Sequence, residues 1–245
     1  MRLTEHLYLV GGAEPEWSPS DPLDSQVYLL DTSDGFVAVD SGAGRSVEAI
    51  LAEADASGVA ASAIRWLLLT HGHADHAGGA AAWSAAVPSI EVLASPEVAT
   101  WISDGDEEAT SVDRARSAGI YPGDYRLRPC ATAPVAGAEI RLGSIVLSVI
   151  PTPGHAAGHL SFAGVIDGAL TLFSGDALFP GGRVLLQDTW DCDLSASLRS
   201  VERLAAIEPE RLLAGHLPPV LDAAATHVNL ALQRMARLLP PALLA

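Results

Sequence analysis

Four side chains that bind metal ions in proteins lie within one short segment of this sequence. His71, His73, Asp75 and His76 occur in the run THGHADH at residues 70–76. Imidazole and carboxylate groups are ligands of Zn²⁺, Fe and Mn sites. Because His71 and His73 are only two residues apart, they do not share a helix face, and we expect a loop between a strand and a helix. The segment therefore predicts a metal site.

Three further side chains of the same types follow other segments with strand-like patterns. Each comes directly after a glycine, and these residues are His155, Asp176 and His216, behind segments 145–150, 170–173 and 212–214. Glycine allows a sharp turn and a close approach of backbone to a buried site. One such pair is a weak signal, but their recurrence behind three segments indicates loops that supply a common site.

The elements that must position these loops alternate along the chain. We expect an antiparallel meander at 6–10, 26–30 and 36–39, with a turn at Asp34-Gly35, then a helix at 46–54, a strand at 64–69 and a helix at 77–86. A second β-rich block spans 138–142, 145–150, 160–165 and 170–173, followed by a helix at 195–206, a strand at 212–214 and a helix at 221–239. Two β-rich blocks with helices predict an α/β protein with two facing sheets, a four-layer αββα sandwich.

This ligand pattern resembles the metallo-β-lactamase-fold metallohydrolase superfamily, in particular its glyoxalase II-like and lactonase-like branch. The resemblance covers nearly the whole chain up to His216 and implies the same αββα sandwich. It also implies a complete set of metal ligands, in which one metal is held by His71, His73 and His155, a second by Asp75, His76 and His216, and both by the bridging Asp176. A water or hydroxide would form the second bridge.

Two metals of this kind activate water near neutral pH and polarise a carbonyl or phosphoryl oxygen. We expect Zn, with Fe or Mn as alternatives, and Asp75 is the candidate acid and base, the alternative being ligation alone. Asp40 either orients a metal-bound imidazole or caps the following helix. His159 completes a further histidine pattern of the family but is not expected to bind metal.

Composition limits the partners of the protein. The chain has 14 basic and 30 acidic residues, a net charge of −16, so we expect no binding of nucleic acid. No apolar run approaches the ~20 residues of a membrane helix. The first ten residues do not resemble a secretory signal, and the two cysteines are far apart, which suits the cytoplasm. The oligomeric state stays open.

Length favours a single domain over residues 1–245. Its least regular part, 95–135, is expected to contain short helices and to form a lid or pocket wall, the alternative being a solvated surface excursion. Candidates for the pocket lining are Tyr121, Tyr125, Arg183 and Trp190.

The predicted function is hydrolysis of a small ester, thioester or lactone by a metal-bridging hydroxide. Only residues 217–245 follow His216, which favours a shorter thioesterase relative over the glyoxalase II type with an added helical region. The alternatives are a phosphodiesterase or nuclease, a mononuclear iron sulfur dioxygenase, and a noncatalytic metal-binding module.

Overall fold

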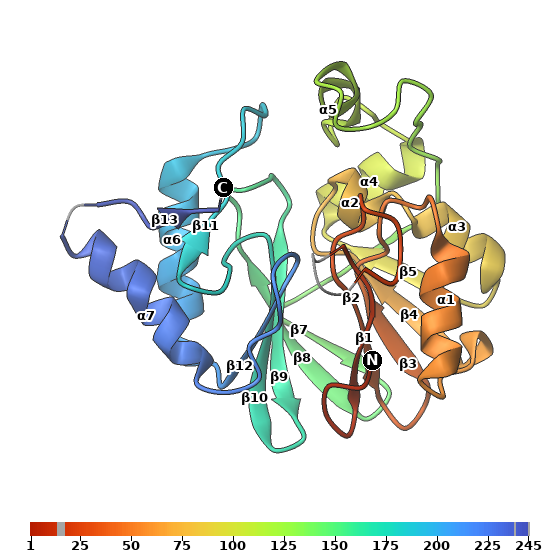
Figure 1. Ribbon diagram of the computed structural model, residues 1–245, viewed down its shortest axis with the longest axis horizontal. Helices are drawn as coiled ribbons and strands as arrows, with labels where there is room; N and C mark the ends of the chain where they lie inside the picture. The colour runs from red at the N-terminus through yellow and green to blue at the C-terminus, as the bar shows by residue number, and fades with distance from the viewer. Residues whose placement is uncertain (14–17, 238, 245) are drawn as a thin grey trace.

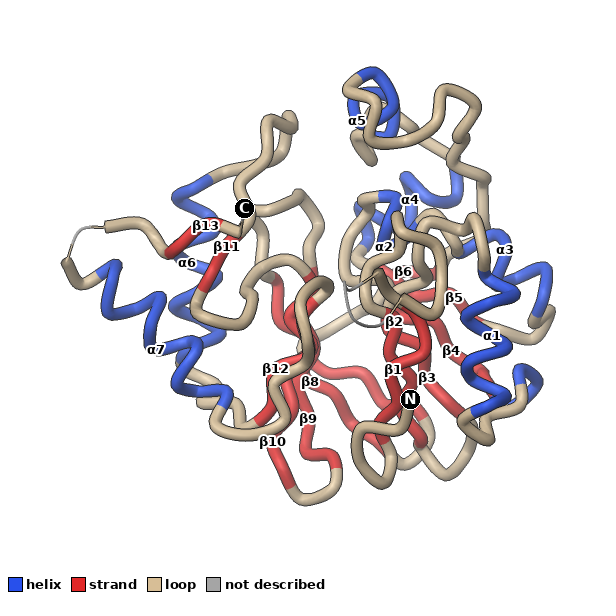
Figure 2. The backbone as a smooth tube through the Cα atoms, viewed as in Figure 1, coloured by secondary structure: helices blue, strands red, loops and turns tan. Residues whose placement is uncertain are grey.

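Two mixed β-sheets lie face to face in the centre of the molecule, with helices on their outer sides (Figures 1 and 2). The computed structural model describes residues 1–13, 18–237 and 239–244. Between the sheets, Leu7 and Tyr28 of the first pack with Phe162 and Phe173 of the second. Two further apolar cores lie between each sheet and its own helices. This is the expected αββα order of layers.

The first sheet has the strand order β1-β2-β3-β4-β5-β6. Its strands are β1 (Leu7–Gly11), β2 (Val27–Asp31), β3 (Phe36–Val39), β4 (Ile64–Leu68), β5 (Glu91–Ala94) and β6 (Ala133–Pro134). The first three strands are antiparallel, as the meander predicted, and the rest pair in parallel. β5 and β6 were not anticipated: β6 has only two residues, too few for a periodic pattern, and β5 lies directly before the segment treated as irregular.

The second sheet has the order β12-β10-β9-β8-β7. Its strands are β7 (Glu139–Leu142), β8 (Ile145–Pro151), β9 (Leu160–Ile166), β10 (Ala169–Gly175) and β12 (Arg211–Ala214), and a small separate ribbon pairs β11 (Arg183–Val184) with β13 (Ala242–Leu243). β9 is antiparallel to β8 and β10, and β12 is parallel to β10. The carboxyl ends of β8, β10 and β12 therefore meet at one edge.

Helices cover the outer face of each sheet (Figure 1). The first sheet carries α1 (Val47–Ala56), α3 (Ala80–Ala86) and α4 (Pro96–Asp104), and the second carries α6 (Leu194–Ala205) and α7 (Ala224–Met235). Short helices are η1 (Ala61–Ala63), α2 (Ala74–Ala77) and α5 (Val112–Ser117). None of the helices in the described part of the chain has the length and apolar character needed to cross a bilayer.

Two of the helices expected from the sequence differ in extent from those in the structure. The helix expected over 77–86 is divided into α2 and α3 at Gly78 and Gly79, where a Cβ on Gly79 would lie 2.2 Å from the carbonyl oxygen of Ser41. The helix expected over 221–239 spans Ala224–Met235, and position 238 of that prediction lies outside the described residues, as do positions 14–17 and 245 of the single-domain prediction. The short helices expected within 95–135 are α4 and α5.

Candidate metal centre

The loops that carry the predicted metal-binding side chains lie together at one edge of the two sheets. One hydrogen bond joins the sheets there, from the backbone N–H of Leu160 to the carbonyl oxygen of Thr70 at 2.7 Å. A second runs from the N–H of Gln26, just before β2, to the carbonyl oxygen of Gly215, just after β12, at 2.7 Å. These bonds hold the loops at this edge of the first sheet against the second sheet, which lets ligands from both halves face each other.

Three imidazoles form the first group of donors. The Nδ1 atom of His73 lies 3.1 Å from Nε2 of His71 and 3.0 Å from Nε2 of His155. His155 points its Nδ1 at the carbonyl oxygen of Leu185, 3.2 Å away. A carbonyl can only accept, so Nδ1 of His155 carries the proton and its Nε2 offers a lone pair to the group.

The second group consists of Asp75, His76 and His216. Asp75 Oδ2 lies 3.1 Å from Nε2 of His216 and 3.5 Å from Nε2 of His76. The other carboxylate oxygen, Oδ1, accepts a hydrogen bond from the Tyr121 hydroxyl at 3.5 Å. The two oxygens of Asp75 therefore have different neighbours, one in the donor group and one on a wall of the adjoining cavity.

Asp176 lies between the two groups. Its Oδ2 is 3.5 Å from Nε2 of His155 in the first group and 3.5 Å from Nε2 of His216 in the second. Its Oδ1 is 3.3 Å from Nε2 of His76. All seven predicted side chains are thus brought together, and Asp176 contacts members of both groups, a position from which one carboxylate can join two ions.

The chemistry of these donors fits divalent metal ions. Nε2 of His76 and Oδ1 of Asp176 are buried and have no hydrogen-bond partner among the described residues. A buried polar atom without a partner costs free energy, and a cation would satisfy both atoms at once. A further cluster of possible donors, Glu5, His6 and Asp167, lies on the surface away from this centre.

Asp40 orients His76 and does not cap a helix. Its Oδ2 accepts a hydrogen bond from Nδ1 of His76 at 2.8 Å, which directs Nε2 of that ring toward the donor group. The N–H and hydroxyl of Thr70 donate to the same carboxylate, at 2.8 Å and 2.9 to 3.0 Å. The residue that precedes α1 is Ser46. Of the two roles considered for Asp40, the structure therefore supports the first.

His159 binds the backbone of Asp176 and does not offer a ring nitrogen to the donor groups. Its Nε2 accepts a hydrogen bond from the backbone N–H of Asp176 at 3.1 Å, so the ring proton is on Nδ1, which lies 2.9 Å from the Thr152 hydroxyl. The Thr152 hydroxyl in turn lies 2.8 Å from that of Ser161. Both ring nitrogens are occupied, which is why His159 is not available as a metal ligand.

The electrostatics of the centre differ between the two groups. Burial, assisted by the surrounding imidazoles, lowers the pKa of His71 well below its usual value, and burial lowers the pKa of His155 to about 4. Burial also opposes charge on His76, but Asp176, Asp75 and Asp40 outweigh it and raise the pKa of that ring. The first group is therefore neutral, the form that binds metal, and the second attracts positive charge.

The glycines that precede the ligands are required by close packing. A Cβ on Gly215 would lie 2.2 Å from Oδ1 of Asp176 and 2.4 Å from Cε1 of His76. Gly175 has a φ of +50°, and its Cβ would lie 2.7 Å from Nε2 of His159. A side chain at position 215 would displace the donors themselves, and one at position 175 would displace His159 behind them.

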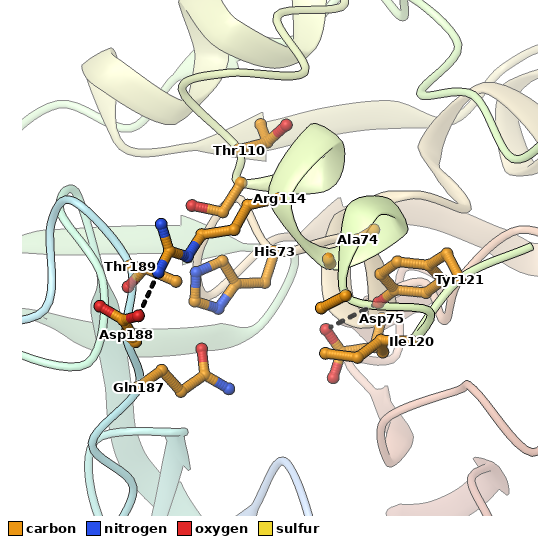
Figure 3. Close-up of a pocket in the computed structure, with 13 residues that line it drawn as sticks. His73, Ala74, Asp75, Thr110, Arg114, Ile120, Tyr121, Gln187, Asp188 and Thr189 are labelled. Atoms are coloured by element: carbon orange, nitrogen blue, oxygen red, sulfur yellow. Dashed lines mark hydrogen bonds and ion pairs between the residues drawn. The ribbon is translucent and has the colours of Figure 1, made fainter. Parts of the chain in front are cut away.

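A cavity of about 420 Å³ opens beside the donor groups (Figure 3). One end is formed by His73 and Asp75, and the remaining lining comes from Ala74, Thr110, Ser111, Arg114, Ala115, Ala118, Ile120, Tyr121, Gln187, Asp188 and Thr189. Many of these residues fall within 95–135, which places that segment along the cavity rather than in solvent. Gln187, Asp188 and Thr189 come from the loop between β11 and α6, and Ala74 comes from α2. The volume of the cavity is within the range of small-molecule sites.

The sequence identified this lining only in part. Tyr121 lines the cavity, and Trp190 lines a neighbouring groove. Tyr125 instead stacks on Tyr121 with ring centroids 4.6 Å apart, and its hydroxyl donates to the carbonyl oxygen of Ala43. Arg183 lies outside the lining. Arg114 and Gln187 were not anticipated, since no local motif marks them.

Comparison with known proteins relates the chain to enzymes. The sequence model of the metallo-beta-lactamase superfamily matches residues 20–216. A hydroxyacylglutathione hydrolase of Xanthomonas euvesicatoria pv. vesicatoria (strain 85-10) is 31% identical over 217 residues, 86% of this chain and 69% of the relative. A Beta-lactamase-like protein 2 homolog of Drosophila melanogaster is 28% identical over 221 residues, 88% of this chain and 65% of the relative. The chain thus spans about two thirds of each.

Solved structures share the fold. A metallo-beta-lactamase family protein from Thermus thermophilus superimposes with a TM-score of 0.70 at 25% identity, covering 96% of this chain and 81% of the other. BJP-1, a subclass B3 metallo-beta-lactamase of Bradyrhizobium japonicum, gives a TM-score of 0.72 at 19% identity, with coverage of 97% and 92%. At 19% identity, the latter likeness is evidence of fold alone.

Proposed function

The chain belongs to the metallo-beta-lactamase superfamily and is a metal-dependent hydrolase, and we propose that it hydrolyses a small thioester, ester or lactone with two divalent metal ions. The observation that carries this proposal is the position of Asp176 between two groups of donors at the end of a cavity. A structural metal site is normally closed by four ligands, whereas this centre opens on a space for a substrate.

In the proposed centre, His71, His73 and His155 hold one ion, Asp75, His76 and His216 hold the other, and Asp176 binds both. Bound there, two divalent cations lower the pKa of a water molecule and polarise a carbonyl oxygen. We propose zinc, because imidazole and carboxylate donors suit it, with iron and manganese as alternatives.

Asp75 is the proposed acid and base. It lines the cavity, and its side chain reaches both the donor group, through Oδ2, and the Tyr121 hydroxyl, through Oδ1. The carboxylate can therefore accept a proton from a water molecule at the end of the cavity and pass it to the leaving group. Tyr121 holds the carboxylate in place during this transfer, since it is buried and stacked on Tyr125.

The relatives favour a thioester among the substrates considered. The Xanthomonas relative is named a hydroxyacylglutathione hydrolase, and that name describes the cleavage of a thioester. The cavity also has the mixture of apolar and polar groups typical of a small-molecule site, with Ala115, Ala118 and Ile120 beside Thr110 and Gln187.

A panel of substrates tests the proposal. The zinc-loaded protein should release thiol from small acyl thioesters, and more slowly hydrolyse the matching esters and lactones, without consuming oxygen. Turnover confined to phosphodiesters, or thiol oxidation that requires iron and oxygen, would replace the proposed reaction by one of the alternatives. Absence of turnover with all of these substrates, in protein that holds two metals, would contradict the assignment.

A further inference from the structure

One cation lines the cavity beside the metal centre. Arg114, on α5, is the only Lys or Arg among the described residues of the lining, and the chain contains no lysine. Figure 3 shows its guanidinium extending across the cavity, beside His73, toward Asp188 on the opposite wall. Any negatively charged group of a substrate in this cavity therefore has one side chain with which it can form an ion pair.

The present partner of Arg114 is an exposed carboxylate. Its Nη2 atom forms an ion pair with Oδ2 of Asp188, and the side chains of Arg114 and Asp188 are 53% and 98% exposed. Ion pairs between exposed groups contribute little to stability, so this contact opens readily. The carboxylate of a substrate can therefore replace that of Asp188 as the partner of Arg114.

The neighbouring Arg116 differs from Arg114 in burial and in contacts, and its contacts are those of a structural residue. The side chain of Arg116 is only 20% exposed, and its Nη2 lies 2.8 Å from Oε2 of Glu107. Its Nη1 donates to the carbonyl oxygen of Tyr125 at 3.0 Å. Arg116 thus joins the segments before and after α5 through partly buried contacts, whereas the ion pair of Arg114 among the described residues is the exposed one with Asp188.

The rest of the cavity suits the remainder of such a substrate. Ala115, Ala118 and Ile120 offer an apolar surface, and Gln187 and Thr189 stand beside Asp188 on the opposite wall (Figure 3). A guanidinium binds a carboxylate through two parallel N–H donors, which fixes the orientation of the bound group as well as its charge. The reacting bond would then lie toward Asp75.

We propose that Arg114 binds a carboxylate of the substrate and that Asp188 competes with it as an internal substitute. The proposal rests on the proposed hydrolase function and deepens it, because it names the substrate class as acyl compounds that carry a carboxylate at some distance from the bond to be cleaved. Arg114 is then a residue that determines specificity, and Asp188 reduces the affinity for these substrates.

Binding of stable analogues tests the proposal without relying on turnover. The probes are thioethers in which a methylene replaces the thioester carbonyl, carrying a terminal carboxylate or the matching primary amide, on the acyl side or on the thiol side. Calorimetry on the zinc-loaded protein should show that Arg114→Gln weakens a carboxylate analogue by about tenfold, the loss expected for one charged hydrogen-bonded pair, and leaves its amide unchanged. Asp188→Asn should strengthen the same carboxylate analogue.

Arg128→Gln is the matched control, because it removes the same charge from an exposed side chain outside the cavity lining. It should leave all analogues unchanged. Equal weakening of carboxylate and amide by Arg114→Gln would show a structural role and overturn the proposal. An unchanged carboxylate affinity in either variant would also overturn it, since that carboxylate would then bind the metals or another site.

Turnover of the corresponding thioesters separates this proposal from the function on which it rests. If the wild-type protein hydrolyses none of them, the proposed function fails, while the calorimetry still decides the role of Arg114. If it hydrolyses carboxylate and amide equally well and Arg114→Gln changes neither KM, the hydrolase function stands and the carboxylate site is wrong.

Discussion

Asp40 and His76 are in contact at 2.8 Å, between Oδ2 and Nδ1, although 36 residues separate them in the sequence. Asp40 follows β3 and has a φ of 61°, a left-handed conformation that Asp tolerates better than most residues. His76 is fully buried on α2. The contact leaves Nε2 of His76 facing Asp176 and Asp75, so one hydrogen bond sets the direction of a proposed metal ligand.

Replacing this carboxylate should weaken metal binding. Asp40→Asn keeps the shape of the side chain but loses the charge that holds Nδ1–H of His76, and we expect a loss of about 10 to 100-fold in affinity for one of the two metals. Competition with a chelator measures this affinity. Asp34→Asn, in the exposed turn before β3, is the control. Equal metal affinities in both variants would mean that Asp40 has no role in the centre.

Asp75→Asn should separate proton transfer from ligation. If Asp75 moves protons, the variant should retain metal yet lose on the order of 10²-fold or more in kcat, the contribution typical of general acid and base catalysis. Metal analysis and steady-state kinetics on the same sample provide the two readouts. A wild-type kcat with two bound metals would leave Asp75 as a ligand at most.

The segment over the cavity should set specificity. Shortening residues 104–124 removes α5 and the apolar wall with Ile120, so KM should rise or substrate preference should change, while the metal content stays the same because none of the proposed ligands lies in this segment. Circular dichroism checks that the shortened protein folds. Unchanged kinetics on every accepted substrate would assign the segment to the surface.

The contribution of the His6–Asp167 pair to the stability of the protein should depend on pH. His6 forms an ion pair with Asp167 in the turn after β9. Burial acts to raise the pKa of Asp167, but hydrogen bonds from His6 and Thr4 outweigh it and lower this pKa to about 2. The hydrogen bond to Asp167 in turn raises the pKa of His6. Stabilisation through Asp167 is lost as pH falls from about 3.9 toward 2, and that through His6 is lost as pH rises above about 6.5.

Both members of the pair are therefore charged at about pH 5.5, between these two windows. Asp167→Asn should lower the midpoint of denaturation more at about pH 5.5 than at about pH 8.5, where His6 is neutral and only the hydrogen bonds that His6 and Thr4 donate to the carboxylate remain to be lost. Chemical denaturation of both proteins at both pH values measures this difference. An equal effect at the two pH values would show that the charge of His6 contributes nothing.

Sequence patterns predicted the layers and the convergence of the donors because both depend on local signals. Strands such as β3 have clear bounds, and a glycine before His155, Asp176 or His216 marks a loop that cannot tolerate a side chain. The role of Asp40 could not be decided in the same way. A capping carboxylate would accept hydrogen bonds from N–H groups at the start of a helix, whereas Asp40 accepts one from the imidazole of His76. Which of these groups the carboxylate meets depends on how β3 and α2 are packed.

The cavity wall was the least predictable part. Arg114 and Asp188 are 74 residues apart and belong to segments without periodic patterns, so no local signal pairs them. Tyr121 was a candidate on composition alone, and Tyr125 and Arg183, chosen on the same ground, face elsewhere. Lining residues come from loops, whose positions follow from tertiary packing rather than from propensity.

In the proposed function, hydrolysis depends on two metal ions that are held by the residues around Asp176. Zinc should be added stepwise to protein that has been freed of metal by chelation, with thiol release from an acyl thioester measured at each ratio. We expect no turnover without metal and a rise that is complete only near two zinc ions per chain, with little turnover in Asp176→Ala at any ratio. Turnover in the metal-free protein, or a plateau at one ion per chain, would contradict the proposed function.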